Sequence, residues 1–261
     1  MSENTNKLIN IAICQMNIAP DKSVNLQKAE SMIRKACKDN NSEIVVLPEM
    51  FNCPYNNSYF SRFSETYPGE TTSMLSGLAR ELNIFLIGGS IPEKDGDRIF
   101  NTSFIFGRDG NMIARHRKVH LFDINIKNSI SFKESRFISP GKDITVFDTD
   151  LCMIGVAICY DMRFPEFISK MSLLGAKLII VPAAFNTITG PAHWHITARV
   201  RALDNQVYFA CASPSRDTGG KYVAYGHSLI ADPWGSVIAE ACEEETILAA
   251  TIDLSEVERI R

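Results

Sequence analysis

LCMIGVAICYDMRFPE, at residues 151–166, is an almost wholly apolar run that ends at Cys159 and passes at once into charged and bulky side chains. Such a run predicts a buried strand that ends where a pocket can begin. A thiol carried by a rigid strand into a polar turn is placed like a nucleophile, whereas a cysteine inside a strand would serve packing. The remainder of the sequence helps to choose between these interpretations.

Parts of this stretch occur twice in the chain. AIC at residues 12–14 matches AIC at residues 157–159, and PEMFN at residues 48–52 matches PAAFN at residues 182–186. Two predicted hairpins also align without a gap, with these pairs of matching positions: Ser103 with Ser228, Ile105 with Ile230, Gly110 with Gly235, Ile113 with Ile238 and Ala114 with Ala239. The order of the matches is the same in both halves, which predicts two similar structural units.

Hydrophobic periodicity supplies the expected elements of each half. In the first half we expect strands at residues 9–16, 44–47, 84–90, 102–106 and 111–116, and helices at residues 21–38 and 71–82. In the second half we expect strands at residues 144–148, 153–158, 178–181, 207–212, 226–231, 236–241 and 247–252, and helices at residues 165–174 and 194–205. Residues 48–68 are expected to be irregular.

Two sheets, each covered by helices on one face, can bury their bare faces against each other. We therefore predict an α/β fold, a four-layer α-β-β-α sandwich of two similar sheet-plus-helix halves. These halves would form a single domain over residues 1–261.

Composition limits the class of protein. The chain has 261 residues, 45% of them hydrophobic, and a formal net charge of −3, as in ordinary soluble globular proteins. No stretch approaches the roughly 20 apolar residues of a membrane helix, and residues 1–6, MSENTN, do not resemble a signal peptide. We expect a cytoplasmic protein with neither membrane nor nucleic-acid partners, since no basic run is present.

Cysteine usage supports this expectation. The chain has seven cysteines, an odd number, and no Cys-x-x-Cys pair. This pattern argues against a disulfide framework and against a zinc knuckle. We expect reduced thiols.

The repeat acts as an internal control, because positions that serve only the fold should look alike in both halves. Glu49 corresponds to Ala183, so the carboxylate is not needed to form this strand exit, and a functional role is favoured. The alternative is a solvated loop glutamate.

The same control is less decisive for Cys159, because its counterpart Cys14 keeps the thiol and both could be packing residues. Only Cys159 is followed by Arg163 and by an expected helix start at Pro165. A cation and a helix N-terminus both lower the pKa of a thiol, so Cys159 is the better candidate nucleophile.

Lys118 directly follows the expected strand at residues 111–116. Glu49, Lys118 and Cys159 thus all lie just past strand ends, where catalytic groups collect in open α/β sheets. The alternatives for Lys118 are a solvated surface lysine and, with its basic neighbours, a phosphate-binding face.

These three residues lie in motif blocks that resemble those of the nitrilase superfamily of carbon-nitrogen hydrolases. The blocks are PEMFN at residues 48–52, RKVHLFD at residues 117–123 and GVAICYDMRFPE at residues 155–166. Further similarities to its Nit branch, and especially to the ω-amidase group, are FKES at 132–135, GPAHW at 190–194, RVRALDNQVY at 199–208 and YGHS at 225–228. Three blocks in order are far more specific than one motif.

The resemblance implies a role for each matching residue. Cys159 would be the nucleophile, Glu49 the general base, and Glu134 a second carboxylate that orients Lys118. Lys118 and the backbone N–H of Tyr160 would stabilise the oxyanion. The implied reaction is hydrolysis of the terminal amide of 2-oxoglutaramate or 2-oxosuccinamate to the acid and ammonia, through a cysteine thioester and without a cofactor.

Other functions stay open at this point. A deaminated-glutathione amidase would share the same three catalytic residues. A non-catalytic interaction protein on the same fold is a further alternative.

An α-keto diacid monoamide carries a carboxylate that needs a cation, and Arg163 is the nearest one in the sequence. It could instead form an ion pair with Asp161 or Glu166. The resemblance places GPAHW at the mouth of the pocket, so His193 is a possible substrate contact. The residues expected to form the walls are Tyr55, Phe122, Phe185 and Thr189.

The histidines suggest two rival interpretations. His193 or another histidine could activate the thiol as in a Cys-His pair, and His193-x-His195 could bind a metal. Without a third ligand nearby in the sequence, we favour structural histidines and expect no metal. His120 and His227 are also expected to be structural.

The resemblance further implies a homodimer that pairs near the layer of the nucleophile. Relatives usually continue beyond Ile252-Asp253-Leu254 with a longer tail than the one that reaches Arg261 here. Because such tails often cross to the partner subunit, we expect the details of assembly to depend on that segment.

Overall fold

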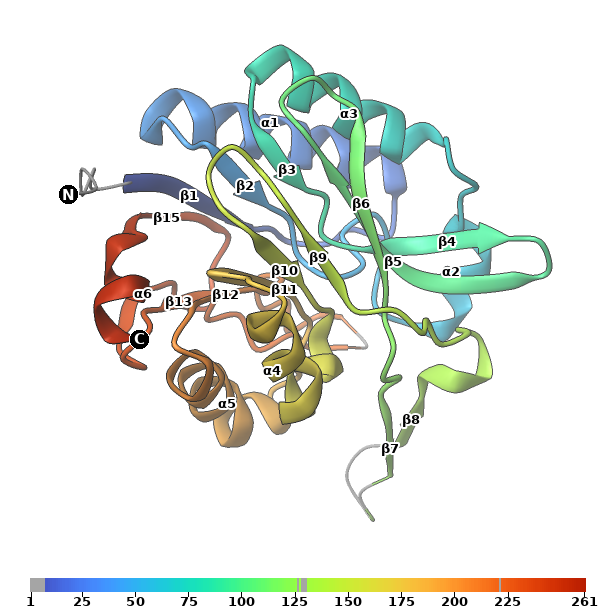
Figure 1. The fold of residues 1–261 in the computed structure, drawn as a ribbon. Helices are drawn as coiled ribbons and strands as arrows, with labels where there is room; N and C mark the ends of the chain where they lie inside the picture. The colour runs from blue at the N-terminus through green and yellow to red at the C-terminus, as the bar shows by residue number, and fades with distance from the viewer. Residues whose placement is uncertain (1–7, 126, 128–130, 221) are drawn as a thin grey trace.

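The computed structural model describes residues 8–125, 127, 131–220 and 222–261. Each half of the chain begins with strands and helices in alternation and continues with a run of strands (Figure 1). The elements of the first half are β1 (Leu8–Gln15), α1 (Lys22–Asn40), β2 (Ile44–Val46), α2 (Asn57–Phe63), α3 (Glu70–Leu82), β3 (Phe85–Ile87), β4 (Ile91–Asp95), β5 (Arg98–Phe106), β6 (Met112–Arg117), β7 (Asp123–Asn125), β8 (Ser131–Lys133) and the 3-10 helix η1 (Glu134–Arg136). The later elements are β9 (Thr145–Phe147), β10 (Ile154–Val156), the 3-10 helix η2 (Cys159–Arg163), α4 (Pro165–Leu173), β11 (Leu178–Pro182), α5 (Thr189–Asn205), β12 (Tyr208–Ala212), β13 (Leu229–Ala231), β14 (Val237–Glu240), β15 (Thr246–Asp253) and α6 (Ser255–Ile260).

The strands form two large sheets. One has the order β15-β1-β2-β3-β5-β4 with β6 added to β5, and the other has the order β14-β13-β12-β11-β10-β9. Each contains three adjacent parallel strands joined through helices, β1-β2-β3 in one and β10-β11-β12 in the other. Helices α1 and α3 cover the outer face of the first sheet, and α4 and α5 cover that of the second (Figure 1). The predicted four-layer sandwich is confirmed.

Side chains alternate between the two faces of each sheet. In β1, Ile11 and Ile13 belong to the core between the sheets, whereas Ala12 and Cys14 pack under the helices of the first half. From the second sheet, residues of β10 and β11 enter the same central core. Each fully buried aliphatic side chain contributes about 1.5–3 kcal/mol, so the apolar inner faces hold the sheets together.

The internal repeat is present in detail. In the β5-β6 hairpin, Ile105 pairs with Ala114 and the register then shifts. In the β13-β14 hairpin, Ile230 pairs with Ala239 and the register shifts at the same point. Residues that align in the sequence therefore also occupy equivalent positions beside equivalent bulges.

The structure differs from the expected elements at several positions. The strand expected at residues 247–252 is β15, which pairs antiparallel with β1 and so joins the sheet of the first half. Residues 48–68, expected to be irregular, contain α2. Strands β4, β7 and β8 and helix α6 were not expected. A helix as short as α2 depends on packing rather than propensity, and it packs through Phe60 and Phe63.

Segments that follow strand ends of both sheets meet at one place. Glu49 follows β2, Lys118 follows β6, and Cys159 follows β10 and begins η2. Among the helices of the described residues, none combines the length and the apolarity that crossing a membrane requires.

Candidate active site

Lys118 lies at the centre of a buried cluster of charges. Its Nζ donates hydrogen bonds to Oε1 of Glu49 and to Oε2 of Glu134, both at 2.9 Å, and to the hydroxyl of Tyr55 at 3.3 Å. The Lys118 and Glu134 residues are completely buried. A buried ammonium is tolerated only with such partners, so the two carboxylates hold Lys118 charged and in place.

Asn101 completes this cluster from β5. Its Nδ2 donates to Oε1 of Glu49 at 2.8 Å and to Oε1 of Glu134 at 3.1 Å. Sequence reasoning missed this residue, although the hairpin alignment that pairs Ser103 with Ser228 places Gly226 opposite Asn101. The comparison that singled out Glu49 could therefore have found Asn101 as well.

Cys159 lies at a sharp change of chain direction between β10 and η2. Its φ is +48°, in the left-handed region that non-glycine residues seldom adopt. Strained positions of this kind concentrate at functional sites and persist only where the surroundings hold them. The thiol is almost fully buried and lies beside the carboxylate of Glu49.

Asp161 holds this turn. Its Oδ2 accepts hydrogen bonds from the N–H of Ile158 at 3.1 Å and from Nε2 of His116 at 3.0 Å. Its Oδ1 accepts from the N–H groups of Val119, at 3.2 Å, and His120, at 2.8 Å, and from Nδ1 of His120 at 2.8 Å. One buried carboxylate thus joins the turn of the nucleophile to the segment that follows β6.

The same contacts keep Asp161 ionised. Burial alone would raise its pKa, but hydrogen bonds from His116 and His120 hold the pKa well below its usual range. His120, expected to be structural, contributes to holding the Asp161 carboxylate in place.

The pKa of Cys159 contradicts one expectation. Burial, and after it the neighbouring Glu49, raises the thiol pKa well above its ordinary value despite Lys118. The helix α4 does begin at Pro165 as expected, but the expected lowering of the Cys159 pKa is wrong, because burial outweighs Lys118 and one ammonium faces two carboxylates. A thiolate would add a further negative charge, so Cys159 rests as a thiol.

Glu49 is the group that can take the proton of this thiol. Burial raises its pKa above the ordinary value, Lys118 opposes that shift, and Glu134 adds to it. Burial by itself would lower the pKa of Lys118, but Glu134 and Glu49 outweigh burial and hold that pKa well above its usual range. The ammonium is therefore permanent, whereas Glu49 can take up and release a proton.

A small cavity opens beside the thiol. Its volume is about 20 Å³, and the residues that line it are Phe122, Cys159, Tyr160, Arg163, Ala184, Phe185, Thr189 and Tyr222. Four of the expected substrate-binding residues, Phe122, Arg163, Phe185 and Thr189, are among them. Tyr160, the expected oxyanion residue, follows Cys159 at the start of η2, where the first N–H groups of a helical turn lack partners within the turn.

His193 is placed differently from the expectation. It is absent from the cavity lining, and its Nδ1 lies 3.0 Å from a terminal nitrogen, Nη1, of Arg163. Burial, and after it Arg163, lowers the His193 pKa, so a neutral ring accepts this hydrogen bond. Within the described residues, Arg163 forms no ion pair with Asp161 or Glu166, and its charge is available to a ligand.

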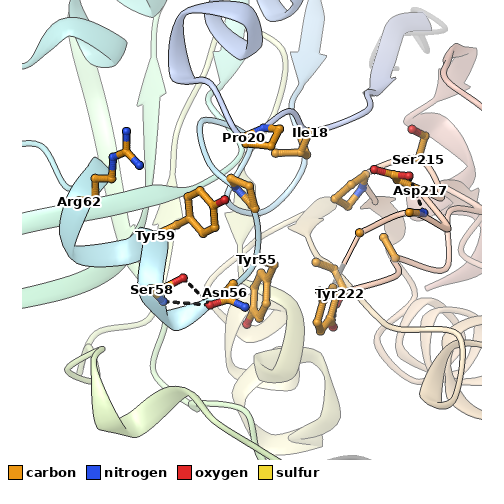
Figure 2. Close-up of a pocket in the computed structure, with 16 residues that line it drawn as sticks. Ile18, Pro20, Tyr55, Asn56, Ser58, Tyr59, Arg62, Ser215, Asp217 and Tyr222 are labelled. Atoms are coloured by element: carbon orange, nitrogen blue, oxygen red, sulfur yellow. Dashed lines mark hydrogen bonds between the residues drawn. The ribbon is translucent and has the colours of Figure 1, made fainter.

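Tyr55 lines a second and larger cavity of about 520 Å³, drawn in Figure 2. Tyr55 and Tyr222 stand close together there, with ring centroids 4.8 Å apart. Tyr222 and Ala184 also line the small cavity, so the two cavities share a wall. Sequence reasoning missed Tyr222, and Tyr55 contacts Lys118 rather than the small cavity.

Comparisons with known proteins identify the family. Residues 10–261 match the model of the carbon-nitrogen hydrolase family. The chain belongs to the carbon-nitrogen hydrolase family. Over 251 residues, this carbon-nitrogen hydrolase is 50% identical to the omega-amidase NIT2-B of Xenopus laevis and 48% identical to the omega-amidase NIT2 of Homo sapiens, in each case over 96% of this chain and 91% of the relative.

A solved structure shows the same fold as this carbon-nitrogen hydrolase. The crystal structure of Nit3 from Saccharomyces cerevisiae, a member of branch 10 of the nitrilase superfamily, superposes with a TM-score of 0.91 and 46% identity, over 98% of this chain and 93% of Nit3. The predicted family and its Nit branch are confirmed.

Proposed function

We propose that this carbon-nitrogen hydrolase is an ω-amidase that releases ammonia from the terminal amide of 2-oxoglutaramate and 2-oxosuccinamate. One observation carries the proposal: Cys159, which lies beside Glu49, shares a small cavity with Arg163, a cation without an acidic partner among the described residues. A nucleophile and a carboxylate-binding group then face the same short ligand. The similarity to the omega-amidases of Xenopus laevis and Homo sapiens supports the same activity.

Acylation begins with transfer of the Cys159 proton to Glu49, and sulfur forms a bond to the amide carbon. The Lys118 ammonium and the N–H of Tyr160 stabilise the oxyanion. Glu49 then gives its proton to the amide nitrogen, the carbon–nitrogen bond breaks, and ammonia leaves. A thioester to Cys159 remains.

Deacylation uses the same residues in reverse. Glu49 takes a proton from water, and the resulting hydroxide attacks the thioester carbon. The second oxyanion is held by the same donors, the carbon–sulfur bond breaks, and Glu49 returns its proton to the sulfur of Cys159. In the net reaction, the amide and one water molecule become the acid and ammonia. Glu134 and Asn101 keep Lys118 and Glu49 aligned throughout.

Substrate length follows from the cavity. A volume of about 20 Å³ corresponds to little more than one water-sized group. The amide end of a short substrate can enter, while its carboxylate meets the guanidinium of Arg163 in a charge-assisted pair. Phe122, Phe185 and Thr189 would form the walls, and Tyr55 would support Lys118 from behind.

A deaminated-glutathione amidase is the second candidate, and one observation favours it. The cavity of about 520 Å³ that shares Tyr222 and Ala184 with the catalytic cavity has room for a longer substrate. A non-catalytic interaction protein is disfavoured, because burying Lys118, Glu49 and Glu134 without a chemical role would cost stability.

The assembly is part of the proposal. Residues 1–261 would form one carbon-nitrogen hydrolase domain, and two copies would pair as a homodimer. Ile196, Leu203 and Trp234 support pairing, since they are 64%, 49% and 69% exposed on α5 and the β13-β14 turn. Light scattering tests it, and a monomer would refute the pairing. Cys14, Cys37, Cys53, Cys159, Cys211 and Cys242 are free thiols, which suits a reducing cytoplasm.

The test is an ammonia-release assay with 2-oxoglutaramate, deaminated glutathione, glutamine and a simple nitrile compared side by side. We expect the highest kcat/KM for 2-oxoglutaramate and no turnover by Cys159→Ser, which should keep the wild-type circular dichroism spectrum. A preference for deaminated glutathione would select the second candidate. Undiminished turnover by Cys159→Ser would refute the mechanism.

A further inference from the structure

Three side chains far apart in the sequence converge outside the active site. His195 comes from α5, His227 precedes β13, and Glu240 ends β14. Nε2 of His195 lies 2.7 Å and Nδ1 of His227 lies 3.2 Å from the same oxygen, Oε1 of Glu240. The three side chains are partly exposed in the single chain. We propose that His195, His227 and Glu240 bind Zn²⁺.

The donor set determines the class of ion. Two imidazole nitrogens and one carboxylate oxygen suit Zn²⁺ and neighbouring transition metals, whereas Ca²⁺ and Mg²⁺ take oxygen donors. Three protein ligands leave one position of a tetrahedral ion for water. Metal binding requires each ring to lose its N–H toward Glu240 and to carry its proton on the other nitrogen.

The distances are close to those of a metal site. Donors about 2.0–2.1 Å from Zn²⁺ are separated by about 3.3 Å in a tetrahedron. The nitrogens of His195 and His227 now stand 2.7 Å and 3.2 Å from the carboxylate oxygen. The three donor atoms all lie within 4.8 Å of one another, so small movements of the two rings and of the exposed Glu240 side chain bring them around one ion.

His227 is held in place before any metal binds. Its φ of +57° is in the left-handed region, its N–H donates to the carbonyl of Cys242 at 3.0 Å, and its carbonyl accepts from Nε1 of Trp194 at 2.6 Å. The ring of Tyr225 lies against the imidazole, with centroids 4.4 Å apart. Preorganisation of this kind lowers the entropy cost of binding an ion.

A second carboxylate stands behind the proposed ligand. Nε2 of His227 lies 3.8 Å from Oε2 of Glu243, which also pairs with Arg216. A metal-binding histidine usually donates its remaining ring N–H to a carboxylate, which orients the ring and makes it more basic. Glu243 is placed for that role once Nδ1 binds the metal.

The arrangement explains why the sequence did not reveal the site. His193 and His195 are neighbours in the chain but contact different groups, since His193 faces Arg163. The other two ligands come from the β13-β14 hairpin. A bound metal would therefore link α5, whose first residue Thr189 lines the catalytic cavity, to that hairpin.

The test is a zinc titration of chelator-stripped protein in competition with a chromophoric chelator. We expect one equivalent of Zn²⁺ for the wild type and loss of that equivalent in His195→Ala. Glu243→Gln should weaken binding by about tenfold or more. His193→Ala, on the same helix, and Cys242→Ser, beside the hairpin, should bind like the wild type.

Two further measurements test whether a variant loses zinc only because it misfolds, and whether cysteine thiols bind the zinc instead. Zn²⁺ should raise the Tm of the wild type but not of His195→Ala or the nearly isosteric Glu240→Gln. The Co²⁺ form should show no thiolate charge-transfer band. The proposal is refuted if the wild type binds no stoichiometric zinc, if His195→Ala and Glu240→Gln keep it, or if Cys242→Ser loses it.

Discussion

Replacing Asp161 with asparagine removes one of two oxygens that join the nucleophile turn to the segment after β6. The remaining oxygen can still accept from Val119 and His120. The new amide then faces two buried donors, the N–H of Ile158 and Nε2 of His116. The substitution therefore turns two satisfied hydrogen bonds into donor–donor contacts.

The size of the effect follows from the number of unpaired donors. Each buried donor without a partner costs about 1–3 kcal/mol, so two cost about 2–6 kcal/mol. His116 can move its proton to Nδ1 and donate to Oγ1 of Thr145, 2.9 Å away, which leaves only Ile158 unpaired. With that shift the loss is about 1–3 kcal/mol of unfolding free energy.

The stability that Asp161 contributes should change with pH in one direction. The folded-state pKa of Asp161 lies below the ordinary value, so its contribution to stability is complete above the unfolded pKa of about 3.9 and is lost as pH falls below it. Asparagine does not titrate. The difference in unfolding free energy between wild type and Asp161→Asn should therefore narrow on acidification from pH 7 to below about pH 4.

Urea unfolding followed by fluorescence measures this difference, and ammonia release measures its effect on the turn. We expect kcat to fall more than KM rises, since Asp161 positions Cys159 without lining the cavity. Asp109→Asn, the same change in the exposed β5-β6 turn, is the control and should have little effect. An Asp161→Asn protein within about 0.5 kcal/mol of wild type at pH 7, or a difference that widens in acid, would refute the reasoning.

Three further predictions concern the catalytic groups. Glu49→Gln should lower kcat by about 10²–10⁴-fold in the ammonia assay, because an amide cannot take the thiol proton; activity that survives this change but is lost in His193→Ala would favour a Cys-His route. Because burial raises the Glu49 pKa and the base must be ionised, kcat/KM should fall as pH drops through an apparent pKa above about 4.3; an acid limb at or below that value would contradict the assignment. Arg163→Ala should raise KM for 2-oxoglutaramate by about 10–100-fold and leave a neutral amide such as propionamide unaffected, and equal losses on both would argue against a carboxylate anchor.

The layered fold was predictable because its signals are local. Alternating apolar side chains and the repeated AIC and P-x-x-F-N segments depend only on neighbours in the chain. The hairpin alignment even predicted where equivalent residues would lie, and Ile105 and Ile230 stand beside equivalent bulges. The prediction that failed was the assignment of the last strand to the second half. This strand, β15, pairs with β1, and such a contact between the two ends of the chain has no local signal.

The catalytic cluster was only partly predictable. Glu49, Lys118 and Cys159 follow strand ends, a position that the sequence marks, and the structure brings all three together. Asn101 lies inside a strand and is marked only by its mismatch with Gly226 in the aligned hairpins, and Tyr222 lies in a loop without such a counterpart. The contact of His193 with Arg163, rather than with the cavity, likewise depends on how α5 packs against η2.

The sequence by itself determined the two-sheet sandwich, the family and the nucleophile candidate with its general base and lysine, because strand periodicity, repeats and motif order are properties of the linear chain. Only the tertiary structure decided the protonation state of Cys159, since a pKa depends on burial and on the count of nearby charges. Here two carboxylates oppose one ammonium. The convergence of His195, His227 and Glu240 was likewise a matter of packing, because their separation along the chain says nothing about their separation in space.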